Sequence, residues 1–291
     1  MGRRDAEGGL TVAVSTSELV TAVDALGIAG RPVLAHVSLR SFGAPVASGA
    51  DGLLDALLSR GCTVLVPSFS EPQFRVDPPL PTRPAGNGVD YSRLPWAAEP
   101  AASGPPYTVD CGLINATLGA LPAALIARAE ARRGRHPLNS FAAVGALADE
   151  LVSTQSPTDV YAPLRKLVEH DGVVLLVGVG LNRMTLLHLA EQRSGRRLFV
   201  RWALGADGRV ITVEVGSCSE GFPRFEPHLR GLAGTVTVGV SGWAAYPAGP
   251  VLDAAVAAIA NERDITRCSD AGCLACRDAV AGGPVGVGPL G

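Results

Sequence analysis

The chain has 291 residues, of which 47% are hydrophobic and 18% are charged, and its formal net charge is -2. This composition is typical of a globular protein with enough apolar side chains for a sizeable core. Because the charges nearly balance, there is no overall basic field, and neither nucleic acid nor a membrane is the expected partner.

The apolar runs and the start of the chain favour a cytoplasmic protein. No run reaches the ~18 apolar residues that a membrane span needs, and no apolar segment of a signal peptide follows the basic residues near the start. Disulfides are rare in the cytoplasm. Clustered cysteines are therefore expected to be metal ligands or simple packing residues.

The first half of the chain predicts a parallel α/β unit. Apolar residues at helical spacing over 15–28 and 51–61 alternate with buried strand-like runs over 32–39 and 62–69. Residues 71–111 are then rich in proline and glycine. A connection of this length is either a functional lid over a substrate or a disordered insertion.

The second half of the chain continues the alternation and adds one hairpin. Helices are predicted over 118–133, 162–172, 185–193 and 251–263, a strand followed by a helix within 140–152, strands over 173–180, 235–240 and 243–249, and a β-hairpin over 198–215. We therefore predict a single-domain α/β fold, with a mixed central sheet, helices on both faces and a β-hairpin. The domain is expected over 1–264, followed by a cysteine-containing tail over 265–291.

The glycine turn after the strand at 173–180 has two interpretations. Gly178 and Gly180 resemble half of a dinucleotide-binding fingerprint, but the position of its third glycine is taken by Arg183. A nicotinamide-dependent oxidoreductase is therefore disfavoured. The free amides of the following helix remain suited to holding an anion without any such motif.

The helix after this turn carries the strongest catalytic candidates. Thr185, His188 and Glu191 are spaced so that they share one face of the helix. His188 is either a catalytic imidazole or a hydrogen-bonded histidine of the core. Glu191 is either its neighbour in a site or a carboxylate that pairs with an arginine.

Polar residues that follow predicted strands form a second set of candidates. Ser38, Arg40 and Ser41 follow one strand, and Ser68 and Ser70 follow the next. In a parallel sheet, ligands bind beyond the carboxyl ends of the strands, so these residues favour phosphate or carbonyl binding. Ordinary turn chemistry is the alternative.

A third candidate is the segment that begins at His136. This residue precedes a proline, which favours an extended or turning backbone, and Ser140 follows it at the start of a strand. Histidines on loops of rigid scaffolds are frequent in functional sites. The alternative is a surface turn.

The cysteines are concentrated near the end of the chain. Cys268, Cys273 and Cys276 are closely spaced, and Cys218 is the candidate for a fourth ligand of a structural zinc site. Cys62 and Cys111 are interpreted as packing residues. The alternative for the cluster is a reduced, flexible tail.

Four segments in order resemble the aminoglycoside 3-N-acetyltransferases, antibiotic N-acetyltransferases whose fold differs from the GNAT fold. They are LAHVSLRSFG (34–43), DGLLDALLSRGCTVLVPSFS (51–70), RHPLNSFAAVG (135–145) and LLVGVGLNRMTLLHLAE (175–191). The resemblance implies transfer of an acetyl group from acetyl-CoA to an amine, with His188 as general base. It also implies that Thr185 and Ser38 lie near the thioester oxygen.

The same resemblance assigns the cofactor pocket and the partner of His188. The residues expected to contact acetyl-CoA are Ser38, Leu39, Arg40, Ser41, Ser68, Ser70, His136, Ser140 and Phe141. The family places the carboxylate that orients its histidine at the end of the hairpin, where this chain has Ser217. We therefore expect Glu220, or else Glu214, to take that role.

The sequence leaves two kinds of amine acceptor open for the same acyltransferase reaction. An aminoglycoside, as in antibiotic resistance, requires an acidic cleft, and residues 71–111 offer Glu71, Asp77, Asp90, Glu99 and Asp110 among arginines. The alternative is another amine of secondary metabolism. A different class is a zinc-binding interaction module without catalysis, and a homodimer is compatible with each of these hypotheses.

Overall fold

The most apolar segments of the sequence form the centre of a seven-stranded sheet. The protein is described here by a computed structural model, which covers residues 12–78, 83–93 and 105–285. β1 (Pro32–Val37), β2 (Thr63–Pro67) and β6 (Val173–Val177) lie side by side and parallel, with β1 in the middle. Parallel strands buried on both faces read as continuous apolar runs, as these three do.

Antiparallel strands extend the sheet on both sides, so that the order is β4-β5-β2-β1-β6-β10-β9. The outer strands are β4 (Arg132–Arg133), β5 (Phe141–Val144), β9 (Gly234–Val238) and β10 (Ser241–Pro247). The predicted mixed sheet is thus confirmed.

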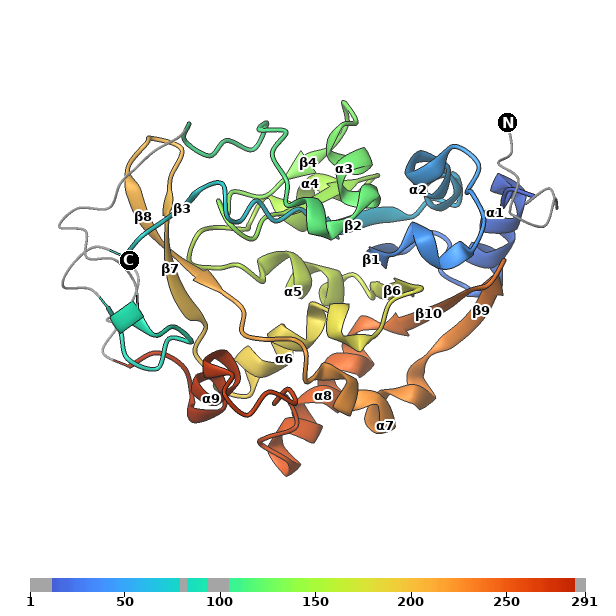
Figure 1. Cartoon of the computed structure of the whole chain (residues 1–291). Coiled ribbons are helices and arrows are strands. Elements are labelled where there is room, and N and C mark those ends of the chain that lie inside the picture. Colours follow the sequence, from blue (N-terminus) through green and yellow to red (C-terminus); the bar gives the residue numbers. More distant parts are fainter. Residues whose placement is uncertain (1–11, 79–82, 94–104, 286–291) are drawn as a thin grey trace, which may run out of the picture.

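Alternate side chains of the central strands point to opposite faces of the sheet, and each face is covered by helices (Figure 1). Leu34 and Val174 belong to one apolar cluster, and Val33 and Val173 belong to the other. The first face packs against α4 (Ala148–Val152), α5 (Ala162–Glu169), α6 (Leu186–Arg193) and α8 (Ala248–Asn261). The second packs against α1 (Thr16–Ala25), α2 (Gly49–Ser59) and α3 (Ala120–Ile126).

The predicted hairpin forms part of a second, three-stranded sheet at one end of the molecule (Figure 1). β7 (Phe199–Leu204) pairs with β8 (Val210–Val215) and with the short β3 (Arg75–Val76). Phe199 and Val213 form an apolar cluster with Ala279 of α9 (Leu274–Ala281). The C-terminal segment therefore packs against this small sheet.

The structure differs from the sequence-based prediction at the helix expected over 118–133. α3 ends at Ile126, and Arg132–Arg133 pair with β5 instead. The guanidinium of Arg133 donates hydrogen bonds to the backbone carbonyls of Ser68, Cys111 and Leu113. These contacts hold the segment in an extended conformation, against its helical propensity.

Part of the proline-rich connection over 71–111 is also fixed to the small sheet. The side-chain amide of Asn87 donates to the backbone carbonyl of Val200, and its oxygen accepts from the Val200 amide. The backbone N–H of Gly88 donates to Asp278 at 2.8 Å. Residues 79–82 and 94–104, which include Glu99, lie outside the described residues. None of the described helices is long and apolar enough to cross a membrane.

Candidate active site

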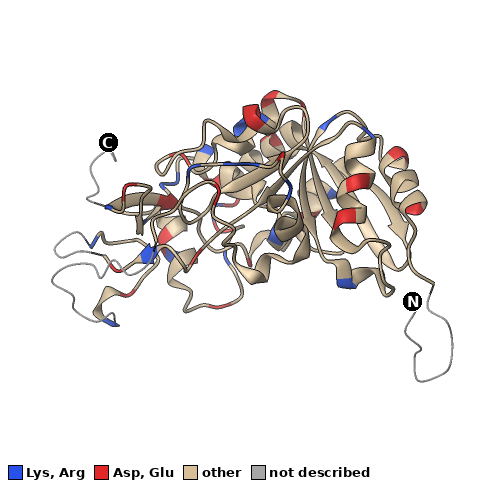
Figure 2. Cartoon of the chain, turned by 90° about the horizontal axis from the view of Figure 1, so that it is seen from above, with Lys and Arg blue, Asp and Glu red and all other residues tan. Residues whose placement is uncertain are grey.

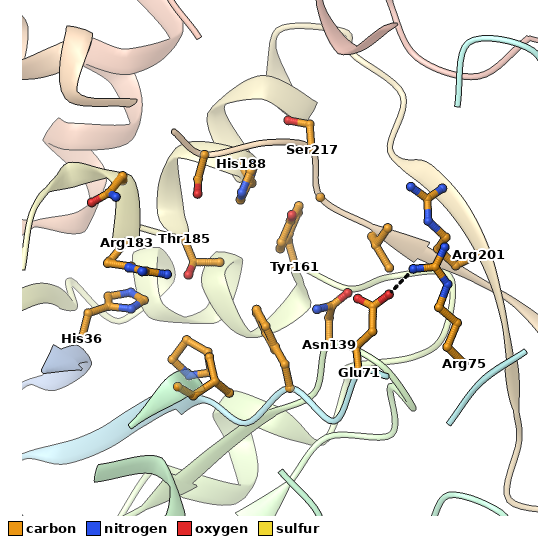
Figure 3. A pocket seen from close by; sticks show the side chains of 17 residues that line it. His36, Glu71, Arg75, Asn139, Tyr161, Arg183, Thr185, His188, Arg201 and Ser217 are labelled. Carbon is orange, nitrogen blue, oxygen red and sulfur yellow. Dashed lines mark hydrogen bonds and ion pairs between the residues drawn. The ribbon is translucent and has the colours of Figure 1, made fainter. Parts of the chain in front are cut away.

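A cavity of about 410 Å³ opens where the carboxyl end of β1 meets α6 and the end of the hairpin. We call it the histidine cavity, because His188 lines it together with Tyr161, Thr185 and Ser217 (Figure 3). Its lining comes from segments far apart in the sequence. An imidazole, hydroxyl groups and a phenol therefore face the same space.

His188 is held by a carboxylate of its own helix. Its Nδ1 atom lies 2.8 Å from Oε2 of Glu191, three residues further along α6. The other oxygen of Glu191 accepts a hydrogen bond from Arg196 at 2.5 Å, and Ser217 donates to Oε2 at 2.8 Å. Only 4% of Glu191 and 6% of Arg196 are exposed. The chain of contacts fixes the orientation of the imidazole.

These contacts also explain the ionisation of the buried carboxyl. Burial opposes the charged form of Glu191, but the hydrogen bond and charge of His188, with the charge of Arg196, hold its pKa below the usual value. Arg196 in turn donates to the hydroxyl of Thr266 and to the carbonyl of Arg263. Glu191 is therefore a carboxylate, and it is the acceptor for an N–H at Nδ1 of His188.

Aromatic rings hold the imidazole from the sides. The ring of Tyr161 lies parallel to that of His188, with centroids 6.1 Å apart, and the Phe222 ring is edge-on at 4.7 Å. Gly216 passes close by. A Cβ atom there would lie 2.3 Å from the Tyr161 hydroxyl and 3.2 Å from Cγ of His188. Only glycine fits here without displacing these side chains.

The partner of His188 is a correction to the sequence-based prediction. Glu220 is exposed, and its carboxylate accepts a hydrogen bond from Asn182 at 3.2 Å. Glu214 lies elsewhere: burial and then the charge of Asp159 raise its pKa to about 7. Neither residue contacts the imidazole in the structure, because the i, i+3 geometry of α6 already supplies a carboxylate.

A second cavity, of about 640 Å³, lies beyond the carboxyl ends of β1 and β6. We call it the strand-end cavity. Ser38, Leu39, Arg40 and Arg183 line it. The guanidinium groups of Arg40 and Arg183 have no carboxylate partner among the described residues. The cavity thus presents two cations at the sheet edge where ligands of parallel sheets bind.

The glycine turn beside this cavity makes room for a serine side chain and does not form a dinucleotide-binding loop. Gly178 has φ +60, and a Cβ atom there would lie 1.9 Å from the hydroxyl oxygen of Ser41. The Ser41 hydroxyl donates to the carbonyl of Ser38. It also lies 2.6 Å from the hydroxyl of Ser241. Ser41 therefore braces the turn, and it does not line either cavity.

His36 is a residue of both cavities that the sequence analysis missed. It lies on β1, and its Nε2 atom is buried without a hydrogen-bond partner. Burial and the charge of Arg183 lower its pKa to about 3, so the ring is neutral near pH 7. Pro67, Leu118 and Arg183 also line both cavities. The two spaces therefore meet beside a neutral imidazole.

Five of the residues expected to contact the cofactor lie in the interior, away from both cavities. Ser68, Ser70, His136, Ser140 and Phe141 are completely buried and line neither cavity. Their neighbours in the chain, Pro67, Phe69 and Asn139, line the histidine cavity, and Pro67 also lines the strand-end cavity.

The ring of His136 shows why this segment is structural. Nε2 lies 2.7 Å from the carbonyl of Glu214, and Nδ1 accepts hydrogen bonds from the amides of Leu138 and Asn139. Burial lowers the pKa of His136 to about 4, although the hydrogen bond to the Glu214 carbonyl opposes the shift. The neutral imidazole joins the loop to the hairpin.

The four cysteines singled out in the sequence come together. The Sγ atoms of Cys218, Cys268, Cys273 and Cys276 all lie within 4.8 Å of one another. The backbone N–H of Cys268 donates to Sγ of Cys276 at 3.3 Å. Cys218 follows β8 in the chain, whereas the other three belong to the C-terminal segment. The cluster thus joins that segment to the strand beside the histidine cavity.

This fold is that of the antibiotic N-acetyltransferases, a class of acyltransferases distinct from the GNAT fold. The chain belongs to the aminoglycoside 3-N-acetyltransferase family, whose family model matches residues 34–260. The fold and family predicted from the four motifs are both confirmed.

Individual relatives support the assignment. Aminoglycoside N(3)-acetyltransferase IV of Salmonella sp is 33% identical over 182 residues, which are 60% of this chain and 58% of that protein. Aminoglycoside N(3)-acetyltransferase IX of Micromonospora chalcea is 36% identical over 169 residues, 56% of each. The matched part is thus less than two thirds of either relative.

A solved structure matches over more of its length. It is a histidine-to-alanine variant of the aminoglycoside acetyltransferase AAC(3)-IVa in complex with gentamicin. The two share 25% sequence identity with a TM-score of 0.72, covering 94% of this chain and 99% of that one.

Proposed function

We propose that this protein transfers an acetyl group from acetyl-CoA to the amine of a small molecule, with His188 as general base. The observation that carries the proposal is the His188–Glu191 pair at the wall of a cavity that meets a second, cationic cavity. The histidine cavity suits the acceptor amine, and the strand-end cavity suits acetyl-CoA as the donor. Membership of the family supports the same chemistry.

Acetyl-CoA fits the strand-end cavity by charge and position. Its phosphates require cations, which Arg40 and Arg183 supply without competition from a carboxylate. The thioester end would then reach the junction at His36. The hydroxyl of Thr185, which makes no hydrogen bond among the described residues, also lines the histidine cavity.

The proposed transfer uses one proton path. An alkyl ammonium has a pKa of about 10, so it must lose one proton to solvent before it can attack, and the resulting amine loses its second proton to His188 as the N–C bond forms. With Nδ1–H bound to Glu191, Nε2 of His188 has the free lone pair that accepts a proton from the amine. As the N–C bond forms, the carbonyl oxygen gains charge, and the Thr185 hydroxyl is the available donor. The C–S bond then breaks, and the proton passes from His188 to the departing thiolate of CoA.

Acceptor assays test the proposal directly. The protein should be stabilised against heat by acetyl-CoA and CoA but not by NAD, and it should release free CoA thiol with some members of an amine panel. The panel should include aminoglycosides, as the acceptors named for the relatives, and other metabolite amines. Absence of any stabilisation by CoA species would refute the transferase function.

We also propose that the four cysteines hold a structural zinc ion. Tetrahedral Zn–S bonds of about 2.3 Å place sulfur atoms ~3.8 Å apart, a spacing that fits within the observed cluster. An N–H that donates to Sγ of Cys276 favours the thiolate that zinc requires. With four protein ligands, the ion would serve folding and not catalysis.

A further inference from the structure

The lining of the histidine cavity has the wrong charge for a polycation. Among the described residues, three arginines line it, Arg75, Arg183 and Arg201, and the one carboxylate is Glu71. Elsewhere in the chain, basic and acidic residues are interspersed (Figure 2). The excess of positive charge is therefore a local property of this cavity.

The cations lie at opposite ends of the cavity. Figure 3 shows His36 and Arg183 at one end, Glu71, Arg75 and Arg201 at the other, and His188 between them. Because Arg183 also lines the strand-end cavity, its end belongs to the donor. The end with Glu71 and two arginines is left for the acceptor.

The acceptor end has two guanidinium groups and one carboxylate among the described residues, and the carboxylate pairs with only one of them. Glu71 lies 2.8 Å from Arg75. Arg201 donates only to backbone carbonyls, those of Asn87 and Val200. Burial, and then the nearby charge of Arg75, lower the pKa of Arg201. This half-buried cation makes no ion pair with the described residues.

The other acidic residues of the 71–111 segment do not change this balance. Asp77 and Asp110 are exposed and away from the cavity lining, and Asp90 is bound to Ser92 and Arg93. The residues of this segment outside the described ranges carry a single charge, that of Glu99. One more carboxylate would bring the acceptor end to two acids and two arginines, which is still no excess of negative charge for a polycation.

We infer that the acceptor is an amine that also carries an oxyanion, a carboxylate or a phosphate, and that Arg201 binds this group while the amine faces His188. The planar guanidinium matches both anions with paired hydrogen bonds. A polycationic acceptor would instead meet like charge. This inference rests on the proposed function, because it names the acceptor of the same transfer.

Three amines of equal chain length test the inference. Aminobutyrate, aminopropylphosphonate and aminobutanol each have an amine three methylenes from a carboxylate, a phosphonate or a hydroxymethyl group. Binding to the CoA-loaded full-length protein is measured by calorimetry, with kanamycin as a polycation. At least one anion should bind about tenfold or more tightly than the alcohol, as expected of charge-assisted hydrogen bonds. The anion that binds more tightly shows whether the site prefers a carboxylate or a phosphate.

Three variants test whether Arg201 causes the preference for the anion. Arg201→Gln should reduce the preference for the anion to about twofold or less, and Arg201→Lys should keep part of it. Arg209→Gln, an exposed arginine of the same hairpin, should keep all of it. A preference that survives in Arg201→Gln overturns the inference.

The remaining outcomes separate the two proposals. Equal binding of the alcohol, tighter binding of kanamycin, or binding of none of the four amines overturns the inference alone, provided that acetyl-CoA binds. Failure of acetyl-CoA to bind overturns the proposed function itself. If Arg201→Gln weakens CoA binding tenfold, the arginine serves the donor, and the inference is also overturned.

Discussion

His188 and Glu191 lie one turn apart on α6, with Nδ1 of the imidazole 2.8 Å from Oε2 of the carboxylate. The carboxylate fixes the imidazole tautomer, and Arg196 fixes the carboxylate. Because the pair is built within one helix, α6 itself sets the spacing of the two residues, and Ser217 at the end of the hairpin adds a hydrogen bond to the carboxylate. A general base in this position is ready before either substrate binds.

Replacement of the imidazole tests the proposed base. His188→Ala should lower kcat by ~100-fold or more, because proton transfer from the amine then has no positioned acceptor. The affinity for CoA, measured by calorimetry, should stay within about twofold, because the contacts proposed for CoA lie in the other cavity. His228→Ala, at an exposed position on the surface, is the matched control. Full activity of His188→Ala would reassign the ring to packing.

Neutralising the buried carboxylate should affect rate and stability separately. Glu191→Gln should lower kcat by ~10-fold or more, since the imidazole loses the group that orients it. It should also destabilise the protein by about 3 kcal/mol, because Arg196 is left buried without its carboxylate. Urea unfolding measures the second effect.

A double variant separates the two effects. Glu191→Gln with Arg196→Met removes both charges, so it should recover part of the lost stability without recovering the rate. Recovery of both would show that the rate loss of the single variant came only from damage to the fold.

The close approach at Gly216 predicts a steric effect on catalysis. Gly216→Ala should lower kcat by about tenfold or more, because the added methyl must displace the Tyr161 hydroxyl or the His188 ring. Gly242→Ala is the control, since a Cβ there meets nothing within 4 Å. Steady-state kinetics of the two variants should therefore differ, and equal rates would contradict the packing described for this ring.

The half-buried carboxyl of Glu214 predicts a pH dependence of stability. Its pKa rises from 4.5 to about 7, so the folded state keeps a proton that the unfolded chain releases at lower pH. Its contribution to stability is complete below about pH 4.5 and is lost as pH rises through about 7.

Melting temperatures measure this dependence. The Tm of Glu214→Gln relative to that of the wild type should increase between about pH 5 and about pH 8, because the variant has no such proton to lose. Glu130→Gln, at an exposed site, should show a constant difference. A constant difference for Glu214→Gln would mean that this carboxyl ionises normally.

Metal analysis tests the zinc site. Purified protein should contain one zinc per chain, and Cys273→Ser should lose it together with several degrees of thermal stability. Cys111→Ser, outside the cluster, should keep the metal. A stable wild type without metal would remove the proposal.

Sequence patterns predicted the centre of the fold because the central strands are unbroken apolar runs. β1, β2 and β6 each match a predicted strand, and the spacing of Thr185, His188 and Glu191 placed them on one helix face. Such short-range patterns determine which side chains share a face. The helices and strands around 126–133 were less predictable, because Arg133 is held by partners distant in the sequence.

Long-range contacts explain what the sequence analysis missed at the site. His136 was expected to contact the cofactor, but its ring bonds to the carbonyl of Glu214, 78 residues away, and lines neither cavity. Glu220 was chosen as the partner of His188 by resemblance, although the helix supplies Glu191. His36 could have been found, because strand alternation places it on the same face as Leu34, at the carboxyl end of β1.

Ser217 and Cys218 are consecutive, and each belongs to a different network. Ser217 holds the Glu191 carboxylate behind the imidazole of His188, and Cys218 lies among the four thiols. Consecutive Cα atoms are ~3.8 Å apart, so there is no slack in the chain to absorb a shift between them. Oxidation of these sulfurs, or loss of the zinc ion proposed there, would therefore shift Ser217 and with it the hydrogen bond that supports Glu191.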